Sequence, residues 1–314
     1  MNKTNPLHFP PRREAVFVLI ALTAFFVLTA LFIGLRPEHV AMAGIYGLLH
    51  FADSSTRKLA VALLPFILFG LSYDWMRVYP NYMVNPIDVR GLYEAELSLF
   101  GLPIDGHVQT LCEFFAVHHH PVADFLAGVF YLCWVPVPIA FGIWLYFTGR
   151  RSLYLRFAQV FLLVNLLGFV GYYLHPAAPP WYVIYHGFEP VLGTPGNVAG
   201  LGRFDALVGV PIFESIYGRN ANVFAAVPSL HSAYMVVALY YAVAGRCSRL
   251  LIALFSIIAL GIWATAVYSA HHYVIDVLLG VGCALLGIVV FEKGLLRIPA
   301  FSRFQQRYTR TVEN

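Results

Sequence analysis

The sequence predicts an all-α protein, a polytopic membrane helical bundle with a six-helix core and an extra N-terminal apolar segment. Hydrophobic residues make up 60% of the 314 residues, charged residues make up only 11%, and the mean hydropathy is +0.72, well above that of soluble domains. The bilayer core offers no water to backbone N–H and C=O groups. Long apolar runs without an alternating pattern therefore satisfy these groups as helices.

Several apolar stretches are long enough to span a bilayer. They are residues 15–35, 59–79, 122–147, 157–175, 223–244, 250–268 and 274–291. Residues 39–51 are apolar but too short to cross, and residues 88–102 have helical spacing with charges on one face, so we expect both to lie along the membrane surface. The sequence thus divides into an N-terminal apolar and interfacial segment (1–58), a membrane-embedded core (59–292) and a basic cytoplasmic tail (293–314).

The distribution of charge predicts an orientation. Successive connections between spans lie on opposite sides of the membrane. Lys and Arg are concentrated in the connections on the side opposite the long 176–222 loop, so the positive-inside rule places this loop outside the cytoplasm. Lys3, Arg12 and Arg13 fit this orientation poorly if residues 15–35 cross. The basic residues lie between apolar runs and not in one patch, which fits orientation signals better than nucleic-acid binding, so no nucleic-acid partner is expected. The four cysteines have no paired spacing and are interpreted as small hydrophobic residues.

Three segments with polar side chains are expected at helix ends on the outer face. They are GYYLHPAAPPWY (171–182), VPSLHS (227–232) and YSAHHYVID (268–276). Helix ends that face one compartment would form a shallow polar site at the level of the headgroups, where lipid phosphates lie. This placement indicates a lipid phosphate as the substrate class.

In the third segment, His272 and Asp276 are four residues apart, so they share a face if the helix has begun. The carboxylate would then accept a hydrogen bond from one ring nitrogen and leave the other nucleophilic. A buried Asp is costly at membrane depth unless it is paired. The alternative is an Asp that only caps the helix, with interfacial histidines as its neighbours.

In the second segment, His231 follows Pro228 and Ser229, residues that commonly start a helix. Its ring would lie in the first turn beside unpaired backbone N–H groups. It could protonate a departing lipid alkoxide while Ser229, Ser232 and the free amides hold phosphate oxygens. The alternative is a histidine that is only packed at the interface.

The motifs Pro228-Ser229-Leu230-His231 and His272-Tyr273-Val274-Ile275-Asp276 resemble the second and third signatures of the type 2 phosphatidic acid phosphatase superfamily. The resemblance covers about residues 120–292. It implies a reaction without metal or other cofactor, in which His272 is the nucleophile and becomes phosphorylated. It also implies that His231 acts as acid and base and that Asp276 orients the nucleophile.

The sequence departs from the phosphatase pattern in its cations. Thr265 and Ala266 stand where Ser-Arg is expected, and residues 171–182 lack the first motif, K-x6-RP. A dianionic phosphomonoester needs more positive charge than a monoanionic diester, so the departures favour a diester substrate. Arg203 and Arg219 in the outer loop could replace the missing cations, or they could be ordinary surface charges.

The segments APPWY (178–182), NVFAAVPSLHS (222–232) and HHY (271–273) resemble the branch typified by the aureobasidin-sensitive inositol phosphorylceramide synthase. This resemblance implies transfer of phosphoinositol from phosphatidylinositol to the primary hydroxyl of ceramide, with release of diacylglycerol. His175, His271 and Asn222 are further candidates for substrate contact. Residues 73–101 are similar to bacterial members of the branch, which implies a bacterial inner membrane.

Other functions fit parts of the sequence. A lipid phosphate phosphatase acting on phosphatidic acid-like or isoprenoid phosphates is the main alternative, and a lipid transporter is the non-enzymatic one. A transporter would be expected to show internal repeats or many polar residues at mid-bilayer, which are not evident here. Consecutive histidines such as His271 and His272 point in different directions and cannot readily share a zinc ion, so no metal site is predicted.

Overall fold

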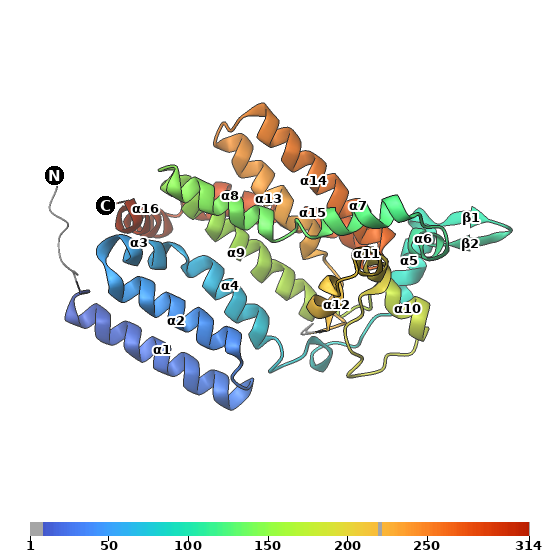
Figure 1. The fold of residues 1–314 in the computed structure, drawn as a ribbon, viewed down its shortest axis with the longest axis horizontal. Coiled ribbons are helices and arrows are strands. Elements are labelled where there is room, and N and C mark those ends of the chain that lie inside the picture. The colour runs from blue at the N-terminus through green and yellow to red at the C-terminus, as the bar shows by residue number, and fades with distance from the viewer. Residues whose placement is uncertain (1–8, 219–221, 314) are drawn as a thin grey trace.

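The structure is a computed structural model that describes residues 9–218 and 222–313. It confirms the predicted all-α bundle. Figure 1 shows long helices packed side by side, with the start of α1 (Arg12–Phe32) and the C-terminal helix α16 (Pro299–Glu313) at one end. We call this end the terminal end. The opposite end, which carries the described part of residues 176–222 and the strands, is called the loop end.

Candidate membrane spans can be identified by length and composition among the described residues. Five helical stretches qualify: Arg12–Phe32, Pro121–Phe147, Arg151–Leu174, Arg249–Tyr268 and Val274–Arg297. The pair α3 (Ser54–Ala62) and α4 (Leu64–Trp75), bent by 45°, would make a sixth. These findings are those expected of an integral, multi-pass membrane protein.

The expectation that residues 39–51 lie along the membrane surface is wrong. They belong to α2 (Pro37–Ala52), which runs back beside α1, and Figure 1 shows α1, α2 and α4 as neighbours in a row. Polar contacts hold both ends of this short helix. At one end His39 Nε2 lies 2.8 Å from Asp74 Oδ2 on α4, and at the other His50 Nε2 lies 3.2 Å from Glu14 Oε1 on α1.

Because α2 returns, the start of α1 lies at the terminal end, so Arg12 and Arg13 do not conflict with the orientation that the sequence predicts. Arg36, by contrast, lies at the loop end, where it is paired with Asp74. The asymmetry of charge is therefore sharper than the sequence predicts. Among the described residues, the basic side chains of the loop end are Arg36, Arg77, Arg90 and Arg203, and the other Arg and Lys lie towards the terminal end.

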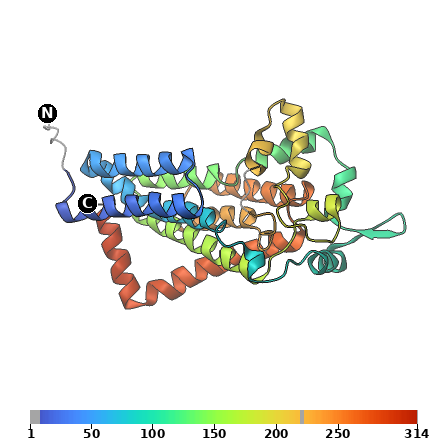
Figure 2. The same cartoon turned by 90° about the horizontal axis from the view of Figure 1, so that it is seen from below.

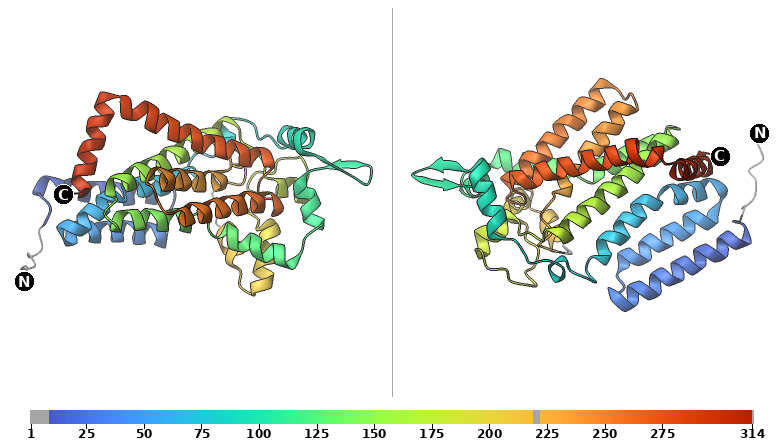
Figure 3. Two further views of the ribbon diagram at one scale, coloured as in Figure 1. Left: turned by 90° about the horizontal axis from the view of Figure 1, so that it is seen from above. Right: turned by 180° about the vertical axis from the view of Figure 1, so that it is seen from behind.

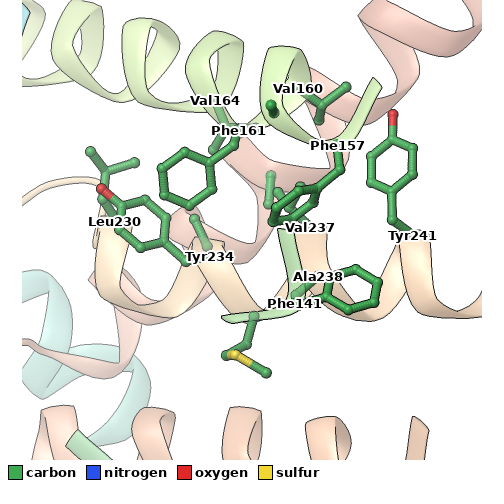
Figure 4. Close-up of a cluster of buried hydrophobic side chains, with 14 of the residues drawn as sticks. Phe141, Phe157, Val160, Phe161, Val164, Leu230, Tyr234, Val237, Ala238 and Tyr241 are labelled. Carbon is green, nitrogen blue, oxygen red and sulfur yellow. The ribbon is translucent and has the colours of Figure 1, made fainter. Parts of the chain in front are cut away.

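The central helices pack around a common core. These helices are α7 (Pro121–Tyr131), α8 (Pro136–Phe147), α9 (Arg151–Leu174), α13 (Leu230–Ala244), α14 (Arg249–Tyr268) and α15 (Val274–Val289). Figure 4 shows Phe157 and Phe161 of α9 interdigitating with Tyr234 and Val237 of α13. Such close packing stabilises helices in lipid, where burial of apolar surface gives little advantage.

Short elements cover the loop end. The helices are α5 (Arg90–Phe100), α6 (Leu111–Val117), α10 (Pro180–His186), α11 (Gly202–Val208) and α12 (Ile212–Tyr217). The hairpin β1 (Leu102–Ile104) and β2 (His107–Gln109) projects beyond them in Figure 2. Its turn is Asp105-Gly106, and both residues have a positive φ, 50° and 79°, which is the conformation that Asp-Gly hairpin turns adopt.

A π-helical segment (Val290–Gly294) and a 3-10 turn (Leu295–Arg297) link α15 to α16. Figure 3 shows α16 turned sharply away from the direction of α15. The site described below lies at the other end of α15.

Candidate active site

Three chain segments meet at the loop end: the end of α9, the start of α13 and the connection between α14 and α15. They border a cavity of about 360 Å³. Most of its lining is aromatic or aliphatic, and its polar lining residues include His231, His271 and His272. The structure thus brings all three segments that the sequence singled out to one cavity, and the first contributes Tyr172, Pro179 and Trp181.

His231 lies in the first turn of α13, two residues after the N-cap residue Ser229. Its Nδ1 is 3.0 Å from His272 Nε2, so the two imidazoles are joined by a hydrogen bond. Tyr131 stacks on the His231 ring at a centroid distance of 5.1 Å, and Trp134 meets it edge-on at 4.4 Å. These contacts fix the ring on the cavity wall.

His272 and Asp276 do not share a helix face, because α15 begins only at Val274. The Asp276 carboxylate instead lies at the helix start. Its Oδ2 accepts a hydrogen bond from Tyr273 N at 2.8 Å and lies 3.5 Å from His272 Nδ1. One fully buried carboxylate therefore both caps α15 and faces the ring nitrogen directed away from His231.

Burial lowers the pKa of His272 to about 4, although a contact with the backbone of Ala226 opposes the shift. Desolvation disfavours the charged imidazolium. His272 is therefore neutral at physiological pH, the state in which a ring nitrogen is a nucleophile.

The connection that carries His272 has a constrained backbone. Ala270 has a φ of 59°, in the left-handed region that costs a non-glycine residue about 1 kcal/mol or more. Contacts from the outer loop hold this conformation. Trp181 N donates to Ala270 O at 2.9 Å, and Gly200 N donates to Ser269 O at 3.0 Å.

Helices α13 and α15 touch through backbone atoms. Ser229 N donates to Asp276 O at 3.0 Å. One turn further along α15, a Cβ added to Gly280 would lie 2.0 Å from Ser229 O and 2.2 Å from Ser232 Oγ. The absence of a side chain at Gly280 permits this approach, as is common where membrane helices pack closely.

The two predicted serines do not line the cavity. The Ser232 hydroxyl contacts Ser229 O at 2.8 Å and Val277 O at 3.0 Å, so it links α13 to α15. The Ser229 hydroxyl is buried without a hydrogen-bond partner among the described residues.

The predicted cations take other roles. Arg203 Nε donates to Asp124 Oδ1 at 2.6 Å, and Arg203 does not line the cavity. Arg219 lies outside the described residues. His175 also lies away from the cavity lining, and its Nε2 is 3.2 Å from Asp88 Oδ2.

Two other predicted residues do line the cavity. His271 is buried, its Nδ1 is 3.0 Å from Ser269 Oγ, and its Nε2 has no hydrogen-bond partner among the described residues. Asn222 contributes its amide, which donates to Asn81 Oδ1 at 2.5 Å.

Asn81 was missed by reasoning from the sequence. It is buried, and its amide nitrogen donates to Tyr172 O and Phe224 O, both at 2.8 Å. It thereby joins the end of α9 to the segment that precedes α13. A single Asn in a polar connection gives no local signal for contacts that span 91 and 143 residues.

The cavity lining identified among the described residues contains no Arg or Lys. Nor do His, Cys, Asp and Glu side chains within residues 9–218 and 222–313 form a group of three that could hold a metal ion. Independence from metal remains a prediction.

The fold and site define a class of membrane phosphotransferase. A family model described as the PAP2 superfamily matches residues 102–290. This is more than half of the chain, which therefore belongs to the PAP2 superfamily.

Individual proteins that resemble this chain indicate which kind of PAP2 superfamily enzyme it is. The chain is 64% identical over 97% of its length to a phosphoinositol dihydroceramide synthase of Bacteroides thetaiotaomicron, all of which is covered. It is 29% identical to an inositol phosphorylceramide synthase of Candida albicans, over 70% of the chain and 46% of that protein. It is 28% identical to the catalytic subunit of inositol phosphorylceramide synthase of Saccharomyces cerevisiae, over 77% of the chain and 58% of that protein.

The chain thus spans about half the length of these fungal relatives. No solved structure matches it. The resemblance found in the motifs is confirmed, and the protein is an enzyme, a phosphotransferase of the inositol phosphorylceramide synthase type.

Proposed function

We propose that this protein transfers phosphoinositol from phosphatidylinositol to the primary hydroxyl of a ceramide-type acceptor and releases diacylglycerol. The observation that carries the proposal is the 3.0 Å contact between His231 Nδ1 and His272 Nε2 on the wall of the cavity. The name of the Bacteroides relative supports dihydroceramide as the acceptor.

The first half-reaction forms a covalent intermediate. The phosphorus of the donor approaches from the cavity and takes the place of the hydrogen bond between the two imidazoles. His272 Nε2 then attacks the phosphorus, and the bond to the diacylglycerol oxygen breaks. Protonated His231 gives its proton to this oxygen, and Asp276 stabilises the positive charge on the His272 ring.

The second half-reaction returns the enzyme to its starting state. The acceptor hydroxyl attacks the phosphorus of the phosphohistidine while neutral His231 takes its proton. The bond between phosphorus and His272 Nε2 breaks, so His272 is again neutral and His231 is again protonated. One histidine serves as acid in the first step and as base in the second.

The composition of the cavity supports a diester donor. A phosphodiester carries one negative charge, whereas a phosphomonoester carries up to two, and the described lining offers no Arg or Lys to balance the second. Arg203, which the sequence offered as a replacement, is already paired with Asp124. This favours a transferase over the alternative lipid phosphate phosphatase.

The aromatic walls of the cavity support transfer over hydrolysis. Tyr73, Trp134, Phe169 and Trp181 are among the lining residues. Apolar surroundings keep water away from a reactive intermediate and leave it to the acceptor alcohol.

We further propose that the protein lies in a bacterial inner membrane with its site on the non-cytoplasmic face. The concentration of Arg and Lys towards the terminal end supports this orientation.

The proposal is tested with purified protein supplied with phosphatidylinositol, with and without ceramide, and separately with phosphatidic acid. Net formation of diacylglycerol and inositol phosphorylceramide only when ceramide is present supports the transferase. Release of inorganic phosphate from phosphatidic acid would support the phosphatase, and movement of labelled lipid without chemistry would support a transporter.

The covalent route is tested by exchange. Labelled diacylglycerol should enter phosphatidylinositol in the absence of acceptor, and His272→Ala should abolish both this exchange and net transfer. If exchange required ceramide in an otherwise active enzyme, direct attack by the acceptor would replace the covalent route.

A further inference from the structure

Helix α5 lies before the residues that the family model matches, yet one of its side chains reaches the start of α15. Glu96 is fully buried. Its Oε1 accepts a hydrogen bond from Val274 N at 3.0 Å, and its Oε2 accepts one from Ile275 N at 3.2 Å. Both oxygens of one carboxylate therefore bind the first two amides of α15.

Acidic side chains thus accept hydrogen bonds from three successive amides at the start of α15. Tyr273 N donates to Asp276, and the next two amides donate to Glu96. The first amides of a helix have no partner within the helix and are a common binding site for phosphate. In α15 the amides of Val274 and Ile275 already donate to the Glu96 carboxylate. They therefore attach α15 to α5 and are not free to bind a phosphate.

The segment directly before α15 carries the proposed nucleophile, His272. His272 is two residues before Val274, and its carbonyl accepts a hydrogen bond from Cys112 Sγ on α6 at 3.4 Å. The two ring nitrogens of His272 face His231 and Asp276, and α5 and α6 hold the backbone around it. A tilt of the first turn of α15 would move Asp276 and the His272 ring together.

We infer that Glu96 is a positioning residue for the transfer, one that sets the direction of His272 Nε2 towards His231 by fixing the start of α15. This inference rests on the proposed function, because it assigns Glu96 a role through His272. Glu96 does not line the cavity, so the role that we assign to it acts through the start of α15.

The test compares two variants of the full-length protein. In Glu96→Gln the amide oxygen can accept one of the two N–H groups, but the NH2 group faces the other, so one hydrogen bond is lost. Glu94→Gln is the matched control, because Glu94 lies on the same helix, is exposed, and forms only a 3.7 Å ion pair with Arg90. Glu96→Asp keeps both oxygens and the charge on a shorter side chain.

Loss of a group that orients a reacting side chain typically costs 10–100-fold, as known for the outer shell of metal sites. We therefore expect Glu96→Gln to lower kcat about 10-fold or more at unchanged KM for phosphatidylinositol. Exchange with labelled diacylglycerol should fall by the same factor. Glu96→Asp should recover part of the loss, and Glu94→Gln should match the native protein. Hydrogen–deuterium exchange of residues 273–276 should quicken in Glu96→Gln alone.

Three results would overturn the inference: a kcat within twofold of the Glu94→Gln control, a rise in KM at unchanged kcat, or a loss that disappears when rates are normalised to folded protein. His272→Ala in the same assays separates this inference from the proposed function. A native protein without ceramide-dependent transfer would refute the proposed function, whereas transfer retained in His272→Ala would refute the role of His272 as nucleophile and with it the positioning role of Glu96. If His272→Ala is inactive while Glu96→Gln is normal, only the positioning role fails.

Discussion

The close contact at Gly280 makes the distance between the two histidines sensitive to a single methyl group. In Gly280→Ala the new Cβ would lie 2.0 Å from Ser229 O, where ordinary contact begins at about 3.4 Å. Helices α13 and α15 must therefore separate locally by about 1.4 Å, the difference between these distances. If the start of α13 takes up this shift, the 3.0 Å bond between His231 and His272 lengthens to more than 4 Å, beyond hydrogen-bonding distance.

The expected loss is large for activity and moderate for stability. A misplacement of about 1 Å can cost on the order of 100-fold in rate, and overpacking typically costs about 1–3 kcal/mol. We expect Gly280→Ala to lower kcat by about 100-fold while the protein still folds. The assay is transfer from labelled phosphatidylinositol to ceramide by purified, monodisperse protein, with the Tm measured in the same detergent.

Gly282→Ala is the control, because it lies on the same helix and an added Cβ there meets nothing within 4 Å. It should have nearly native activity. A Gly280→Ala variant as active as Gly282→Ala would refute the argument that backbone contact sets the spacing of the histidines.

Three further predictions concern the reaction centre. Asp276→Asn should keep the fold, because an amide oxygen can still accept the hydrogen bond from Tyr273 N. It should nevertheless lower transfer by about 100-fold or more, because the imidazolium of His272 loses its stabilising charge. A variant with a native Tm and native activity would contradict this prediction. The folded-state pKa of His272, about 4, lies below its unfolded value of about 6.5, so its contribution to stability is complete above pH 6.5 and is lost as the pH falls towards 4. The cost is at most about 1.4 kcal/mol for each pH unit, and the Tm of the native protein should fall more between pH 7 and pH 5 than that of His272→Gln. Finally, EDTA should leave transfer largely intact, whereas a loss that one specific divalent ion restores would show that a metal is required.

Much of the architecture could be predicted because its signals are local. Apolar runs of sufficient length identify most of the spans, and polar motifs at their ends predict which segments lie near one another. The return of α2 could not be predicted in this way. A helix of 16 residues is shorter than a typical span, and it is held by contacts such as that of His39 with Asp74, 35 residues along the chain.

The site was predictable in its residue types and less so in its contacts. The motifs brought His231, His272 and Asp276 together, but the spacing of four suggested a shared helix face where the structure has a helix cap. Likewise, the sequence offered Arg203 as a phosphate-binding cation or an ordinary surface charge, whereas folding pairs it with Asp124, 79 residues away. Each outcome depends on where a helix begins or on which distant group comes within reach.

The direct attachment of α13 to α15 has a consequence for how such enzymes could diversify. The two histidines belong to one block, whereas much of the cavity wall comes from elsewhere, with Phe69 and Tyr73 on α4 and Asn197 and Tyr217 in the outer loop. Much of the cavity wall and the histidine pair therefore belong to different parts of the fold. Exchange of a wall residue such as Phe69 on α4 would reshape the cavity for a different head group or acceptor while Tyr131, Trp134 and Asp276 still hold the histidine pair.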